Sequence, residues 1–277
     1  MGEGPLWDAA TGDIIWVDID AAVVLRTNLD AADLRTQTCE EPVGSLGLTA
    51  GGGLVGATPT GLRRLDIEGA PYVGHLPEYR PDVRANDGKA APGGRFIVGT
   101  MGRDVPVPGV GSLWSFGGGL ADCLISGTTI PNGLAWTADG TTMYFIDTPT
   151  REVVALEYNS DTGGIGRGHT AVAIGEGLGD PDGMCIDAEG GLWIALWGGS
   201  AVHRYVDGRL AAVIEVPTPL VTCPAFAGSE LDQLVITTAS AGLDSDATDG
   251  AGHLYVANPG VVGAEVGSVG AWADSWN

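Results

Sequence analysis

The chain has 277 residues, of which 44% are hydrophobic and 17% charged, so it can bury a large core and its composition argues against global disorder. The 35 acidic and 13 basic residues give a formal net charge of -22, which argues against nucleic-acid binding because that function needs a basic surface. The 46 glycines show no Gly-X-Y period, which excludes collagen, and their spread between short apolar runs indicates a turn-rich all-β protein.

A turn followed by an apolar strand recurs along the chain. The copies are "DAATGDIIWVDI" from Asp8, "TAGGGLVGAT" from Thr49, "APGGRFIVGT" from Ala91, "TADGTTMYFIDT" from Thr137, "DAEGGLWIAL" from Asp187 and "AGSELDQLVITTA" from Ala227. Their starts are 41, 42, 46, 50 and 40 residues apart. A period of about 45 residues with several strands in each copy is typical of a β-propeller. We predict one six-bladed β-propeller domain over residues 1–277. The even spacing favours it over the alternatives, a β-sandwich or a β-helix.

The fourth copy shows how a blade is expected to form. Its strands would be "GLAWTA", "TMYFIDT", "VVALEYN" and "HTAVAI", joined by turns that carry Asp-Gly or Asp-Thr-Gly. Closure of the ring has two alternatives, because the chain starts almost directly at "GEGPLW". Either "GAEVGSVGAWA" near the C-terminus closes the ring or the sixth blade is incomplete.

Three polar residues stand just before predicted inner strands: Glu3 before "GPLW", Asn132 before "GLAW" and Asp182 before "GMCI". The inner strands of a propeller line its central channel, so these residues would meet at one mouth. Two carboxylates and an amide oxygen are hard ligands suited to one divalent cation: Ca²⁺, Mg²⁺ or Mn²⁺, with Zn²⁺ possible. Alternatively, Asn132-Gly133 and Asp182-Gly183 are plain turn signals and Glu3 is a solvated terminal residue.

The third copy is preceded by "YRPDVRANDGK", which places Arg84, Asn86 and Asp87 at the corresponding position. The guanidinium of Arg84 carries several N–H donors that can bind a carboxylate or hydroxyl groups. The amide of Asn86 can both donate and accept hydrogen bonds. Asp104, after the next strand, is expected to overhang the same mouth. The alternative is a loop turn at Asn86-Asp87-Gly88 with a surface arginine. The isolated His203, in "SAVHRY", is expected to be structural.

These stretches resemble the gluconolactonase/regucalcin family, also called senescence marker proteins, which are six-bladed propellers with one divalent cation. The matching motifs are "GEGPLWD", "RANDGK", "GTM", "PNGLAWTADG", "PDGMCIDAEGGLWIA" and "TCPAF", from Gly2 to about Phe226. The resemblance implies that Glu3, Asn132 and Asp182 are metal ligands and that Arg84, Asn86 and, more loosely, Asp104 contact substrate. Two departures are the missing residues before "GEGP" and a short, Pro-rich stretch between Met101 and Leu113, which implies a small lid.

The expected activity is a metal-dependent lactonase acting on a small-molecule sugar lactone, with Asp182 also orienting or deprotonating the attacking water. The alternatives are a phosphotriesterase-like hydrolase and a non-catalytic calcium-binding or scaffold propeller. No GxSxG, HExxH or P-loop motif occurs. Cys39, Cys123, Cys185 and Cys223 form no CxxC pair and are expected to be free, buried thiols. The absence of a signal peptide or membrane-length apolar run favours a soluble, cytoplasmic protein without a membrane or nucleic-acid partner.

Overall fold

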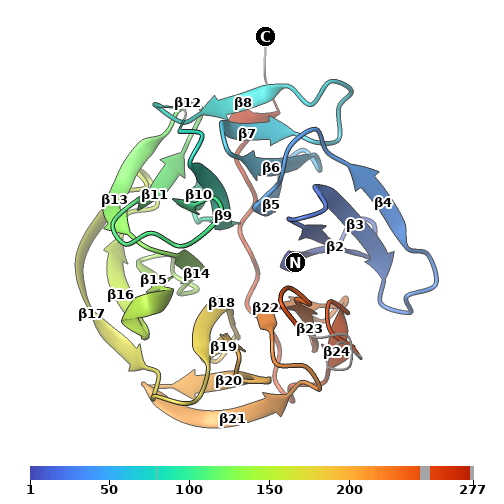
Figure 1. Ribbon diagram of the computed structural model, residues 1–277, viewed down its shortest axis with the longest axis vertical. Helices are drawn as coiled ribbons and strands as arrows, with labels where there is room; N and C mark the ends of the chain where they lie inside the picture. Colours follow the sequence, from blue (N-terminus) through green and yellow to red (C-terminus); the bar gives the residue numbers. More distant parts are fainter. Residues whose placement is uncertain (79, 244–249, 275–277) are drawn as a thin grey trace.

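The computed structural model describes residues 1–78, 80–243 and 250–274, and it arranges their strands as six sheets around a central axis (Figure 1). The first sheet contains β1 (Gly2–Asp8), β2 (Asp13–Asp18), β3 (Val23–Asn28) and β4 (Arg35–Thr38). The second contains β5 (Ser45–Leu48), β6 (Leu54–Thr58), β7 (Gly61–Arg64), β8 (Tyr72–His75) and the short β12 (Gly119–Leu120). The third contains β9 (Val83–Ala90), β10 (Phe96–Gly102), β11 (Gly111–Phe116) and β13 (Asp122–Thr128).

The remaining three sheets complete the ring. The fourth contains β14 (Pro131–Trp136), β15 (Thr142–Asp147), β16 (Glu152–Tyr158) and β17 (Ile165–Ala173). The fifth contains β18 (Asp180–Ile186), β19 (Leu192–Trp197), β20 (Ala201–Val206) and β21 (Arg209–Glu215). The sixth contains β22 (Val221–Ala227), β23 (Gln233–Thr238) and β24 (Tyr255–Ala257). The predicted six-bladed β-propeller is confirmed, and each repeated turn lies between the first and second strand of its blade.

Each blade packs between two others, which explains the continuous apolar runs of the second strands. In β19, all residues except the last are buried, because a strand covered on both faces needs no polar alternation. Residues of neighbouring blades share the same core clusters, as Ile146 and Val153 of the fourth blade do with Ile194 and Leu196 of the fifth. Outer strands are exposed instead: all four residues of β4 face solvent.

Ring closure differs from the first alternative drawn from the sequence. The segment "GAEVGSVGAWA" adds no strand to the sixth blade but crosses the ring, as the red end of the ribbon shows in Figure 1. Its backbone amides at Ala264, Val269 and Gly270 donate to the carbonyls of Ile186, Leu48 and Gly94, at 3.2, 2.8 and 2.8 Å. Among the described residues the sixth blade has three strands, which agrees with the second alternative, an incomplete blade.

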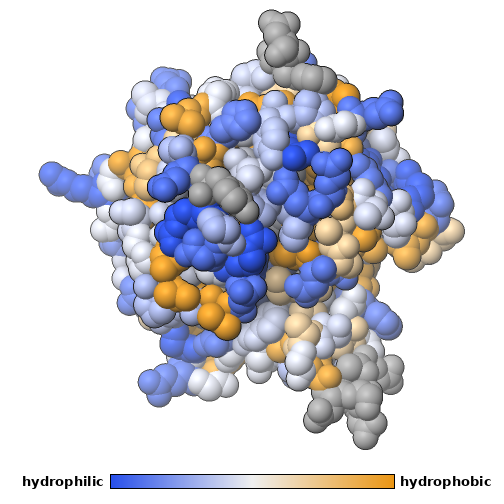
Figure 2. Space-filling model, turned by 45° about the horizontal axis from the view of Figure 1, so that its top comes forward, coloured by the Kyte–Doolittle hydropathy of each residue, from blue (hydrophilic) through white to orange (hydrophobic). Residues whose placement is uncertain are grey.

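On the face seen in Figure 2, hydrophilic residues alternate with scattered apolar patches. All four cysteines are free, as expected, but the expectation of burial holds only for Cys185 and Cys223. Cys39 is half-buried, and Cys123 is exposed because it lies on the outer strand β13. Among the residues that the structure describes, no helix combines the length and apolarity needed to span a bilayer.

Candidate functional site

The inner strands β1, β5, β9, β14, β18 and β22 are neighbours around the central axis. Glu3 lies near the amino end of β1, Asn132 near that of β14 and Asp182 near that of β18. Arg84 and Asn86 lie near the amino end of β9. Since all these strands run in the same sense through the ring, the five residues gather at one mouth of the channel.

A one-residue β-bulge lies at this same level in five of the six inner strands, all of which fall within the described residues. In β1, the pairing with β2 shifts between Glu3 and Leu6; β14 shifts between Pro131 and Leu134, and β18 between Pro181 and Met184. Similar shifts occur in β9 and β22, opposite Val98–Thr100 and between Val221 and Cys223. A bulge leaves the extra residue unpaired and re-aims its side chain, and bulges are common beside active sites.

Asn132-Gly133 and Asp182-Gly183 are turn signals in the sequence but not turns in the structure. Both pairs lie inside strands, and neither glycine has a left-handed backbone conformation. Glycine is required by close packing between blades instead. A Cβ on Gly133 would lie 2.8 Å from the carbonyl oxygen of Asp182. The turn interpretation is therefore wrong for both pairs, and the same holds for Asn86-Asp87-Gly88, which lies inside β9.

A directed chain of hydrogen bonds joins three blades across the mouth. Arg84 Nη1 donates to Asn86 Oδ1 at 2.7 Å, and Asn86 Nδ2 donates to Asn132 Oδ1 at 2.7 Å. Asn132 Nδ2 then donates to Thr148 Oγ1 at 2.7 Å, and the Thr148 hydroxyl donates to the carbonyl of Pro181 at 2.7 Å. Asn86 Nδ2 also donates to the Pro131 carbonyl at 3.0 Å. The chain ends beside Asp182, so it connects the predicted substrate contacts with two predicted cation ligands.

Three buried carboxylates concentrate negative charge here: Glu3, Asp87 and Asp182. Burial, together with repulsion from Asp87, raises the pKa of Glu3 to about 8, although the Gly4 amide and Arg84 partly offset the rise. Burial raises the pKa of Asp182 well above its ordinary value, and repulsion from Glu3 and Asp87 adds to the effect. Burial lowers the pKa of the Arg84 guanidinium against the attraction of Glu3 and Asp182. A group that carried positive charge into this mouth would relieve the repulsion.

The donor set fits a hard divalent cation. The carboxylate of Asp182 makes no hydrogen bond to the described residues, and Glu3 accepts only the amide of Gly4, at 2.9 Å. Asp87 Oδ2 is buried and has no hydrogen-bond partner in the described part of the chain. Within that part, no three His, Cys, Asp or Glu side chains form a metal-binding group, so the ligand set would be two carboxylates with the amide oxygen of Asn132.

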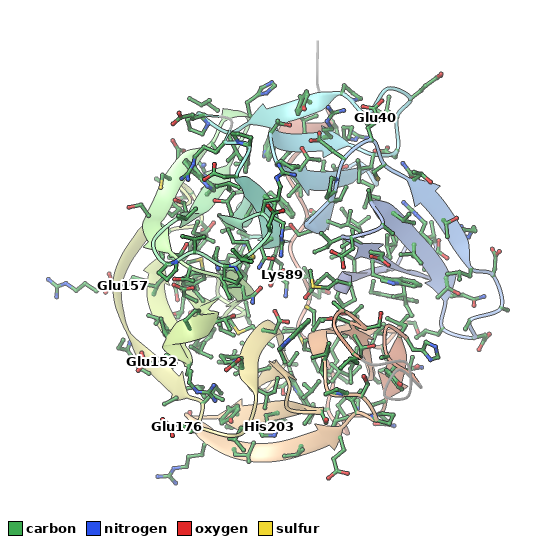
Figure 3. All side chains as sticks on the ribbon, viewed as in Figure 1. Glu40, Lys89, Glu152, Glu157, Glu176 and His203 are labelled. Atoms are coloured by element: carbon green, nitrogen blue, oxygen red, sulfur yellow. The ribbon has the colours of Figure 1, made fainter. Side chains whose placement is uncertain are left out.

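Asp104 lies outside the hydrogen-bonded group that three of the other predicted residues form. It is exposed in the loop of residues 103–110 between β10 and β11, and it makes no hydrogen bond or ion pair with the described residues. This loop is on the same side of the ring as the mouth, because β10 ends opposite the start of β9. His203 is remote from the axis (Figure 3), buried on β20 with Nδ1 3.3 Å from the hydroxyl of Tyr205, which agrees with a structural role.

Sequence reasoning missed Lys89, Thr148 and Thr222 and assigned no role to Asp87. Lys89 lies near the axis (Figure 3), and its Nζ donates to the Met184 carbonyl at 2.6 Å. Two-residue alternation along a strand puts Lys89 on the same face as Asp87, a signal that "NDGK" already contains. Thr222 occupies the bulge of β22, fully buried, and donates to the Gly2 carbonyl at 2.7 Å. No sequence pattern indicated that Thr148 belongs to the site, because its position depends on the conformation of the turn after β15.

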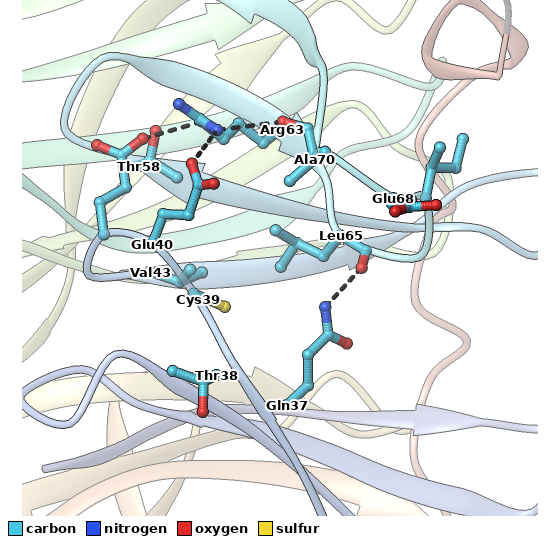
Figure 4. A pocket seen from close by; sticks show the side chains of 13 residues that line it. Gln37, Thr38, Cys39, Glu40, Val43, Thr58, Arg63, Leu65, Glu68 and Ala70 are labelled. Carbon is cyan, nitrogen blue, oxygen red and sulfur yellow. Dashed lines mark hydrogen bonds and ion pairs between the residues drawn. The ribbon is translucent and has the colours of Figure 1, made fainter.

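A cavity of about 240 Å³ lies elsewhere, between the first and second blades (Figure 4). Arg63 pairs there with two carboxylates: its Nη1 lies 3.3 Å from Glu40 Oε2, and its Nε lies 2.9 Å from Glu41 Oε1. Burial raises the pKa of the Cys39 thiol that lines it. An arginine already paired with two carboxylates and a thiol whose pKa is raised offer little chemistry, so the mouth of the channel remains the candidate site.

Comparison with known proteins identifies the family of the chain. The family described as "SMP-30/Gluconolactonase/LRE-like region" matches residues 1–240. Regucalcin of Xenopus laevis is 33% identical over 259 residues, which cover 89% of this chain and 85% of that protein. The crystal structure of regucalcin from Agrobacterium tumefaciens, a calcium-binding protein, is 30% identical with a TM-score of 0.89, covering 97% of this chain and 92% of the other. A luciferin-regenerating enzyme is also 30% identical, with a TM-score of 0.85 and coverage of 96% and 95%. The resemblance noted in the motifs is confirmed: the chain belongs to the SMP-30/gluconolactonase/LRE-like family.

Proposed function

We propose that the protein is a hydrolase that opens a sugar lactone with the help of one divalent cation. The observation that carries the proposal is the gathering of Glu3, Asn132 and Asp182 at bulged strand starts around one mouth, next to Arg84. Family membership supports it, since gluconolactonases give the family part of its name. The name of the bacterial calcium-binding relative favours Ca²⁺ as the first cation to test, with Mg²⁺, Mn²⁺ and Zn²⁺ as the others.

Glu3, Asn132 and Asp182 would hold the cation through their oxygen atoms. When bound, the cation would polarise the ester carbonyl of the lactone and stabilise negative charge on its oxygen. Arg84 would bind sugar hydroxyls, since its Nε and Nη2 make no hydrogen bond to the described residues. Both amide hydrogens of Asn86 are already donated. Its Oδ1 accepts one hydrogen bond, from Arg84, so a second lone pair is left to accept a bond from a sugar hydroxyl.

Asp182 would orient the attacking water and accept its proton, because its carboxylate has no other hydrogen-bond partner in the described residues. The water oxygen adds to the carbonyl carbon, the ring C–O bond breaks, and the proton held on Asp182 passes to the departing ring oxygen. The product is a hydroxy acid, which releases a proton to the solvent at neutral pH. A proton-release assay therefore reports the reaction directly.

The test is a panel of aldonolactones, assayed on protein freed of metal and then supplied with each of the four cations. We expect turnover with at least one cation and none after chelation. The matched control is Asp182→Asn. Binding of Ca²⁺ without hydrolysis of any lactone would instead support a calcium-binding protein, the function named for the bacterial relative. Phosphotriesters included in the same panel test the alternative that the protein is a phosphotriesterase-like hydrolase.

A further inference from the structure

We infer that Thr148 is a positioning residue that fixes the Asn132 amide with its oxygen toward the channel mouth. Thr148 lies at the start of the 3₁₀ turn η1 (Thr148–Thr150), outside the inner strands that carry the candidate ligands. It accepts from Asn132 Nδ2 and donates to the Pro181 carbonyl, both at 2.7 Å. The inference rests on the proposed function in one respect: Asn132 Oδ1 is taken as a cation ligand.

The direction of each bond follows from the chemistry of the groups. The Pro181 carbonyl can only accept, so the single hydroxyl hydrogen of Thr148 is committed to it. The hydroxyl lone pairs then face Asn132 and select the NH₂ side of its amide. On the other side, Asn86 Nδ2 donates to Asn132 Oδ1 at 2.7 Å. If the Asn132 amide were turned over, its NH₂ group would face Asn86 Nδ2 and its oxygen would face Thr148 Oγ1, with no hydrogen bond in either place. Both neighbours therefore hold the amide in one orientation.

The support under Thr148 is itself fixed. The Thr148 amide donates to the Ile130 carbonyl at 3.0 Å, and the preceding Asp147 accepts the amides of Thr129 and Ile130 at 3.1 and 2.8 Å. Thr148 is thus tied to the residues that lead into β14 and, through Pro181, to β18. One hydroxyl therefore sets both the orientation of one candidate ligand and the spacing between two ligand-bearing strands.

The test compares Thr148→Val, which keeps the shape without the hydroxyl, with Thr148→Ser, which keeps the hydroxyl. The matched control is Thr150→Val, because the Thr150 hydroxyl donates to the Asp147 carbonyl on the same turn and lies outside the hydrogen-bond chain. Calorimetry measures the Ca²⁺ affinity of each. Loss of a group that orients a metal ligand typically weakens affinity about 10- to 100-fold, so we expect that loss for Thr148→Val. Thr148→Ser and Thr150→Val should bind like the original protein.

A role in simple blade packing would change stability and leave affinity alone. The inference is therefore overturned if Thr148→Val binds Ca²⁺ normally, or if Thr150→Val weakens binding equally. If the original protein binds no cation, the proposed function fails on its own. The crystal structure of cation-free Thr148→Val then decides the inference: a displaced or rotated Asn132 side chain supports it, and an unchanged Asn132 overturns it.

Discussion

At the residue scale, acidic groups outnumber basic groups at the mouth of the channel. Glu3, Asp87 and Asp182 face Arg84 and Lys89, so three acidic groups meet two basic ones. Burial keeps the carboxylates from being screened by water, which is why their pKa values rise. A bound divalent cation would favour the ionised carboxylates and replace the protons that they otherwise hold.

Asp182 can be tested as both ligand and base. Asp182→Asn has nearly the same volume, so we expect the fold to be kept and the cation affinity to fall with the lost charge. Because an amide cannot take the proton of water, activity should stay about 10²- to 10⁴-fold lower even when excess cation refills the site. Calorimetry and steady-state kinetics on the same preparation check this. Full turnover at high cation concentration would leave Asp182 as a ligand only.

Arg84 is expected to act on substrate more than on the cation. Arg84→Ala removes a charge-assisted donor, which typically costs about 1.5–3 kcal/mol, or roughly 10- to 150-fold in kcat/KM, seen mainly as a higher KM. Arg80→Ala is the control, because Arg80 pairs with Asp82 in an exposed ion pair just before β9. Equal kinetics for the two variants would show that Arg84 does not contact the substrate.

At the element scale, the inner strands approach one another so closely that side chains do not fit between them. Gly44 packs against the backbone of Ala85 and Asn86, and Gly183 against Cys223. These approaches hold the bulges of adjacent blades in register. The Asn-Gly and Asp-Gly pairs therefore combine a polar side chain aimed into the mouth with a glycine that lets the next blade come near.

Gly133→Ala tests this packing. The added Cβ would lie 2.8 Å from the Asp182 carbonyl oxygen and 2.9 Å from Met184 Cγ, so β18 must shift away from β14. Overpacking of this kind typically costs about 1–3 kcal/mol of unfolding free energy. Since the two strands carry Asn132 and Asp182, Ca²⁺ affinity should fall as well. Denaturant unfolding and calorimetry are the measurements.

Gly175→Ala provides the matched control for that substitution. Gly175 lies in the exposed connection between β17 and β18, where an added Cβ would meet only Leu178, at 3.5 Å and beyond. Stability and affinity should remain close to those of the original protein. A Gly133→Ala protein that behaves the same way would show that the blades can separate without cost.

The sequence predicted the repeat and the position of Glu3, Asn132 and Asp182 because strand period, turn glycines and repeat length are local signals. It could not predict the bulges, since a bulge is defined only by the register of the partner strand. The role of Thr148 could not be predicted either, because its hydroxyl bonds to Pro181 in the next blade and that contact depends on how the blades pack. The crossing of the C-terminal segment also escaped, because its contacts join residues far apart in the chain, such as Leu48 and Val269.

At the scale of the whole molecule, the buried carboxylates make stability depend on pH. The pKa of Glu3 is about 8 in the cation-free fold against an ordinary 4.5, so its contribution is fully present below about pH 4.5 and is lost as the pH rises through 8. Asp87 and Asp182 shift in the same direction. We expect the cation-free protein to be less stable at pH 8.5 than at pH 5.5 in denaturant unfolding.

Saturating Ca²⁺ should remove most of that difference, because it stabilises the ionised carboxylates. Glu3→Gln, measured without cation, is the control that separates this effect from the general repulsion of a chain with net charge -22. Its dependence on pH should be weaker than that of the original protein. An identical slope in the two proteins would mean that Glu3 does not titrate in this range.

The C-terminal segment is expected to stabilise the ring without serving the candidate site. It crosses the mouth opposite the site, since it contacts Leu48 and Ile186 at the carboxyl ends of inner strands, and Arg64 pairs with Asp274 at its end, 3.0 Å away. Val269 is fully buried in a core cluster with Phe96, whereas Val266 on the same segment is 56% exposed.

Val269→Ala should therefore lower the unfolding free energy by about 1.5–3 kcal/mol, because it removes two buried methyl groups, each contributing about 0.8 kcal/mol, and leaves a cavity. Val266→Ala, which removes the same atoms from an exposed position of the segment, should change the stability little. Both variants should bind Ca²⁺ like the original protein at temperatures well below unfolding, since the bulged strand ends lie at the other mouth. Thermal and denaturant unfolding, with calorimetry on the folded variants, check these outcomes. Equal stability of the two variants would show that the crossing segment does not hold the ring together, and a loss of Ca²⁺ affinity in Val269→Ala alone would show that the two mouths are coupled.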